Sequence, residues 1–111
     1  MKMAVEVRNL FLSIKINPVD RQAVNQIIRC SSSVAANYRS ATCGRSDAEF
    51  FSKICIVVEE TDETKFWLDY LVSIKLLDEQ AIKGLRNEVD ELVRLFSTIR
   101  KRMREKLGKI K

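Results

Sequence analysis

Histidine is absent from this sequence, and its absence excludes several kinds of chemistry. Of the 111 residues, none is His, one is Pro and three are Gly. Without His there is no Ser-His-Asp or Cys-His nucleophile pair, no Cys/His zinc site and no His general base. The scarcity of Pro and Gly argues against an all-β sandwich or barrel, which needs many turns. No stretch approaches the ~20 apolar residues of a membrane span, so no membrane association is expected.

Cysteine is also scarce, and the start of the chain carries no leader pattern. Cys30, Cys43 and Cys55 are odd in number and include no C-x-x-C pair. A disulfide framework or a thiolate metal site is therefore not expected, and the three should pack as small apolar side chains in helices. No metal or cofactor is expected. Glu6 and Arg8 interrupt the apolar core that a signal peptide needs, so we expect a cytoplasmic protein.

The residues that are present are those of one folded domain spanning residues 1–111. Hydrophobic residues make up 46% of the chain and charged residues 32%. Apolar side chains recur every three or four positions along almost the whole length, which predicts helices. The first helical face comprises Met3, Val7, Leu10, Phe11 and Ile14. Asn17 followed by Pro18 predicts that a second helix starts there, and Gly44 predicts its end.

Two longer helices are predicted in the second half of the chain. Ser46 with Glu49 three residues later has the spacing of a capping box, so a third helix should start there and reach about Lys75. Asp78 is the next candidate cap, with a fourth helix from about Glu79. Its apolar positions are spaced alternately by three and four residues, as in a heptad seam: Ile82, Leu85, Val89, Leu92, Phe96, Ile99 and Met103. Gly84 in this helix indicates either a late start or a close helix contact.

Four helices with short connections predict an all-α fold, an antiparallel up-down-up-down four-helix bundle. The third helix has apolar residues on more than one stripe, for example Val57 beside Val58 and Trp67 beside Leu68. A bundle helix buries one face, so the surplus indicates either contact between copies of the chain or a wide core-facing stripe.

Two polar runs invite a chemical interpretation. Ser31–Ser33 lie inside the second helix, where serine is a poor helix former, and close packing with cross-helix hydrogen bonds from Asn37 is expected there. A Ser33–Lys53 nucleophile pair is the enzymatic alternative. The acidic segment, residues 59–63, lacks the Glu-x-x-His of a diiron site. Its carboxylates are either solvated or paired with Arg29, Arg39 or Lys53.

The charge distribution is uneven, and its basic part lies at the C-terminus. The net charge is +5, but residues 59–80 carry two basic and seven acidic groups, and residues 81–111 carry ten basic and four acidic groups. The densest part is the basic tail, residues 100–111, which contains Arg100, Lys101, Arg102, Arg104, Lys106, Lys109 and Lys111. Such density predicts binding to nucleic-acid phosphates, or alternatively a solvated helix end that suits the helix dipole. Arg45, just before the third helix, is a weaker phosphate candidate.

Three motifs in order resemble a known family. They are R-C-S-S-S-V-A-A-N over residues 29–37, G-R-S-D-A-E-F over residues 44–50, and E-E-T-D-E-T-K-F-W-L over residues 59–68. They are similar to the four helix bundle protein family, also called the 23S ribosomal RNA intervening-sequence protein family. The similarity covers about residues 18–107. Cys30 and Val34 stand where the family usually has Ser and Ile.

The resemblance implies an antiparallel four-helix bundle that assembles as a ring-shaped homopentamer and is linked to nucleic acid. Family genes lie within intervening sequences of bacterial 23S rRNA, and a related accessory variability protein of diversity-generating retroelements is a basic pentamer that binds a reverse transcriptase and nucleic acid. No catalytic residues carry over. The matching positions are expected to be structural or to lie at the oligomer interface: Arg29, Ser33, Asn37, Phe50, Glu60, Glu63 and Trp67, with Ser46 and Thr64.

Taken together, the sequence predicts a non-enzymatic homo-oligomer, a pentamer by resemblance, that binds structured RNA through a basic surface. The residues expected to contact nucleic acid are Arg100, Lys101, Arg102, Arg104, Lys106 and Arg45. DNA, or a nucleic-acid enzyme such as a reverse transcriptase, are further possible partners. The alternative is a protein-interaction scaffold or accessory subunit with no direct nucleic-acid contact.

Overall fold

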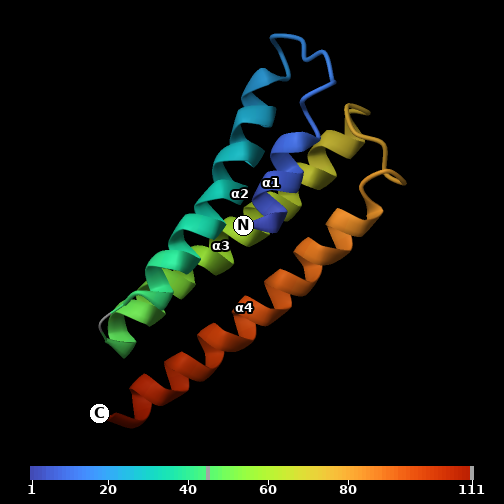
Figure 1. Cartoon of the computed structure of the whole chain (residues 1–111). Coiled ribbons are helices and arrows are strands. Elements are labelled where there is room, and N and C mark those ends of the chain that lie inside the picture. Colours follow the sequence, from blue (N-terminus) through green and yellow to red (C-terminus); the bar gives the residue numbers. More distant parts are fainter. Residues whose placement is uncertain (45, 111) are drawn as a thin grey trace.

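The computed structural model describes residues 1–44 and 46–110, and these residues form a four-helix bundle (Figure 1). The helices are α1 (Lys2–Asn9), α2 (Arg21–Thr42), α3 (Asp47–Ser73) and α4 (Lys83–Ile110). Successive helices run in opposite directions, so the predicted all-α, up-down-up-down fold is confirmed. No strand occurs among the described residues. Within the same residues, no helix combines the length and apolar character needed to cross a membrane.

The helices surround one core in a four-cornered arrangement. α2 packs along α3, and α3 along α4, while the short α1 contacts both α2 and α4. α1 and α3 therefore lie on opposite sides of the bundle (Figure 1). The centre is filled by side chains with no exposed surface, among them Ile27, Ile54, Leu68 and Val89. The buried side chains lie on the seam of α4 and on one face each of α2 and α3, as the spacing of three and four residues predicted.

The end of the first helix and the start of the second differ from the prediction. The first helix stops at Asn9, and Leu10, Phe11 and Ile14 pack on the core from the following non-helical segment. Asn17 does not cap the second helix. Its side chain instead binds the backbone N–H and the carboxylate of Asp20, so residues 18–20 form a turn before α2.

The connections on both sides of α3 follow from capping chemistry. The Ser46 hydroxyl accepts the backbone N–H of Glu49 at 3.1 Å, as the capping-box spacing predicted. α3 ends at Ser73, and Lys75 takes a left-handed conformation (φ 64°) that closes the C-terminus, where Leu76 donates to the carbonyl of Leu71.

α4 begins later than the sequence predicted. The Asp78 carboxylate accepts the backbone N–H of Ala81 at 3.2 Å in a turn that precedes the helix, and α4 itself starts at Lys83. In the part of the chain that the structure describes, a side chain at Gly84 would have no neighbouring helix within 4 Å of its Cβ. Gly84 therefore marks a late start and not a close helix contact.

Candidate functional site

The basic tail forms the end of α4, and its cations differ in what they contact. Lys106 pairs with Asp47 at the start of α3 (3.0 Å), and the Arg104 guanidinium lies 5.8 Å from the centre of the Phe51 ring. Arg100, Lys101 and Arg102 make no ion pair with any described residue. Lys101 and Arg102 are exposed, and Arg100 is half-buried.

Helical geometry explains why the exposure of these three cations differs. Ile99, Met103 and Leu107 are spaced by four residues, are partly buried, and continue the seam that faces the bundle. Because successive helical positions differ by about 100°, Arg100 and Arg102 flank this seam on its two sides and Lys101 points away from it. The structure thus separates Arg104 and Lys106, which fasten α4 to α3, from Arg100, Lys101 and Arg102, which present unpaired charge. Arg45 lies outside the described residues.

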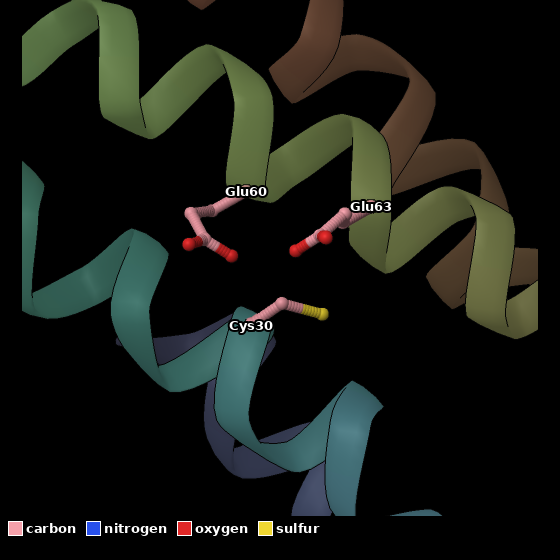
Figure 2. A group of neighbouring side chains, drawn as sticks. All are labelled: Cys30, Glu60 and Glu63. Carbon is pink, nitrogen blue, oxygen red and sulfur yellow. The ribbon is translucent and has the colours of Figure 1, made fainter. Parts of the chain in front are cut away.

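A second cluster joins α2 to α3 through the acidic segment. Arg29 on α2 binds Glu63 at 2.9 Å and Glu60 at 3.4 Å. Of the two alternatives for the acidic segment, pairing with Arg29 therefore holds for these two carboxylates. Glu59 and Asp62 are exposed. Figure 2 shows Glu60 and Glu63 pointing from α3 toward Cys30 on α2. The Cys30 sulfur and one oxygen of each carboxylate lie within 4.8 Å of one another.

Electrostatics favours a structural role for this cluster over cation binding. The Cys30 side chain is fully buried, and burial raises the pKa of its thiol. The thiol group accepts the Thr64 hydroxyl (3.3 Å) and donates to the Ile27 carbonyl (3.5 Å). Three such groups have the chemistry of metal ligands, but a protonated thiol is a weak one, and Arg29 already pairs with both carboxylates. Nothing in the sequence indicated that Cys30 would join them, because its proximity depends on the α2–α3 register.

Glu60 has a buried carboxylate oxygen that lacks a hydrogen-bond partner within the described part of the chain. Its side chain is 18% exposed, and its Oε2 is buried with no hydrogen-bond partner among the described residues. Burial raises the pKa of Glu60, and neighbouring Glu63 acts in the same direction, while Arg29 opposes both. The folded protein therefore binds this proton more tightly than the unfolded chain does.

This raised pKa predicts a pH effect on stability. A carboxyl whose pKa is raised by folding stabilises the protein while it is protonated, and that stability is lost as pH rises through the folded pKa. Lowering the pH from about 7 to about 5 should therefore raise the free energy of unfolding of the native chain relative to Glu60→Gln. Urea unfolding of both proteins at a series of pH values measures this difference. A stability of the native chain relative to Glu60→Gln that stays constant or falls as the pH is lowered would show that the pKa of Glu60 is not raised.

The other predicted interface residues make contacts within the chain. Asn37 donates to the carbonyl and the hydroxyl of Ser33, both at 2.9 Å. Ser31 and Ser32 also donate to carbonyls of α2 itself. The prediction that Asn37 and the serine run form hydrogen bonds across helices is therefore wrong for this chain. Among the described residues, no hydrogen bond joins Ser33 to Lys53. Phe50 and Trp67 are partly buried against the core, as are parts of the second apolar stripe.

Two surface features were missed from the sequence. Phe66 and Tyr70 are 57% and 40% exposed on the outer face of α3, where both contact the Trp67 ring, at centroid distances of 4.9 and 5.3 Å. The second feature is an open groove between α2 and α4. The spacing of Phe66 and Tyr70 was visible in the sequence, but the length of α1, which leaves the groove open, was not. Cys43 was expected inside a helix and lies exposed in the α2–α3 turn, whereas Cys55 is partly buried.

Comparison with known proteins agrees with the fold. The sequence matches the model of a family described as 23S rRNA-intervening sequence protein, over residues 1–98. The chain belongs to this family. The match includes α1 and all the residues expected at an oligomer interface, but it stops short of the basic tail.

A solved structure has the same architecture. A protein of unknown function from the S23 ribosomal protein family of Bacteroides thetaiotaomicron VPI-5482 is 30% identical, with a TM-score of 0.76. The alignment covers 90% of this chain and 93% of that one. No curated protein matches the sequence. For this member of the 23S rRNA-intervening sequence protein family, the solved relative therefore supports the family and the fold.

Proposed function

We propose that this protein is a non-enzymatic homo-oligomer, a pentamer by family resemblance, that binds structured RNA through the basic tail. One observation carries the nucleic-acid part: Arg100, Lys101 and Arg102 follow one another near the end of α4, Lys101 and Arg102 are exposed, and none of the three has an ion pair to any described residue. Unpaired cations attract phosphates, and binding releases the counterions that surround the nucleic acid. The description of the matched family names 23S rRNA without stating a ligand, and RNA is therefore the first nucleic acid to test.

Oligomerisation supports the function by multiplying the charge. The chain has a net charge of +5, and each copy contributes one basic tail. Several tails on one particle bind one RNA with an effective concentration that a single tail lacks. The tail has no aromatic residue, so recognition of the phosphate backbone is proposed in preference to base stacking.

The test is the salt dependence of RNA binding by the purified protein. The probe is a labelled RNA hairpin with a stem of about 16 base pairs, titrated at several salt concentrations between about 50 and 200 mM. If five or six phosphates are contacted, the affinity should fall by about 1,000-fold over this range. An affinity that is flat with salt, or no binding at the lowest salt, contradicts the proposal and leaves the protein-interaction scaffold as the remaining function.

Light scattering behind a sizing column tests the oligomer separately. Five copies of the 12.8 kDa chain give about 64 kDa, and a single copy elutes at its own mass. A mass of one chain contradicts the oligomer without bearing on RNA binding by the tail, so the two parts of the proposal can fail independently.

A further inference from the structure

The first observation is an open apolar groove on the α1 side of the bundle. α1 is eight residues long and α2 is 22, so α1 covers only part of the space between α2 and α4. The remaining groove has a volume of about 920 Å³. Three large apolar side chains along it are exposed: Met1, Tyr38 and Leu95, at 83%, 40% and 53%.

The shape of this groove suits a helix. On the α2 side it is lined by the small residues Ser32, Ala35 and Ala36, which allow another helix backbone to approach closely. On the α4 side Leu92 and Leu95 supply an apolar wall. A helix seated there would pack between α2 and α4, with its apolar face on the groove.

The second observation is a helical stripe on the opposite side of the molecule. Phe66, Tyr70 and Ile74 are spaced by four residues along the outer face of α3 and its C-terminal end, and they are 57%, 40% and 37% exposed. Because α1 and α3 pack on opposite sides of α2 and α4, this stripe faces away from the groove (Figure 1).

One unpaired cation in the groove matches the charge beside the stripe. The exposed carboxylates of Glu59 and Asp62 lie on α3, one to two turns before Phe66. The charged residues that line the groove are Lys2, Arg39 and Glu88; Lys2 pairs with Glu6, whereas Arg39 makes no ion pair with any described residue. The acidic, aromatic helix face thus has an apolar groove with an unpaired Arg39 as its counterpart on the same chain.

We propose that the outer face of α3 of one copy occupies the α2–α4 groove of the next copy. This inference rests on the proposed homo-oligomer and names the surfaces that form it. The contact joins two different surfaces, so it is heterologous, and an open assembly retains one free stripe and one free groove at its two ends until it closes into a ring. The basic tail takes no part in this contact, so Arg100, Lys101 and Arg102 stay available to RNA.

Complementation between two variants tests this arrangement. Phe66→Glu breaks the stripe and leaves the groove, whereas Leu95→Glu blocks the groove and leaves the stripe. Each variant alone is expected to be a monomer of 12.8 kDa by light scattering. An equimolar mixture should form a dimer of about 25.6 kDa, twice the chain mass, and nothing larger, because the one intact stripe fits the one intact groove.

Controls separate this proposal from the proposed function. Val19→Glu changes an apolar side chain that is 88% exposed outside both surfaces, and it should keep the mass of the native protein. Circular dichroism verifies that each variant is helical, and Ala36→Glu provides a second block of the groove. A native oligomer that persists in both single variants, or variants that stay monomeric when mixed, overturns the stripe-in-groove contact while leaving the oligomer intact. A native monomer overturns the oligomer itself.

Discussion

Replacing Arg100, Lys101 and Arg102 with glutamine is expected to weaken RNA hairpin binding by at least 100-fold at about 0.1 M salt. Each phosphate contact contributes about 0.7–0.9 to the slope of log affinity against log salt, so three lost contacts should reduce that slope by about two to three. Fluorescence anisotropy across a salt series measures both quantities. A helix end whose cations only complement the helix dipole would lose a little stability and no RNA affinity.

A matched variant removes the same amount of charge from the other end of the bundle. Lys15, Arg21 and Lys83 are exposed near the connections opposite the basic tail, and their replacement with glutamine also lowers the net charge by three. This control should reduce the affinity far less, because screening weakens its long-range effect at about 0.1 M salt. Equal losses in both variants would mean that net charge, and not the basic tail, determines binding. No loss in the first variant would place the site elsewhere.

Leu68→Ala is expected to lower the free energy of unfolding by about 3 kcal/mol. Leu68 is fully buried in the C-terminal third of α3, the helix on which both α2 and α4 pack. Truncating it loses buried apolar surface and leaves a cavity that the surrounding helices fill only in part. The midpoint of thermal unfolding should fall by roughly 10–15 °C. Unfolding is followed by circular dichroism at a fixed chain concentration, because self-association would otherwise change the apparent stability.

The matched control for this prediction is Leu12→Ala. Leu12 is 64% exposed in the segment after α1. Its truncation should change the free energy of unfolding by no more than about 0.5 kcal/mol. A similar loss at both positions, or a loss below about 1 kcal/mol at Leu68, would show that the core does not centre on α3.

The predictive power of the sequence differed between helix faces and helix ends. The seam from Ile82 to Met103 predicted which side of α4 is buried, because burial of an apolar stripe follows directly from its spacing. The helix starts at Arg21 and Lys83 were misplaced, since they depend on the competing side-chain bonds that Asn17 and Asp78 make in the turns just before them. The Ser46 cap was predicted correctly because its partner lies only three residues away.

The same difference runs through the candidate site. By itself the sequence determined the helical class, the buried faces and the concentration of positive charge in the basic tail, since all three depend on composition and on spacing within one helix. Only the tertiary structure decided that Arg104 and Lys106 are engaged by α3 while Arg100, Lys101 and Arg102 are not. It also brought Cys30 to Glu60 and Glu63 and left the α2–α4 groove open opposite the α3 stripe. These features depend on how helices align with one another, and that alignment is fixed by packing between residues far apart in the chain.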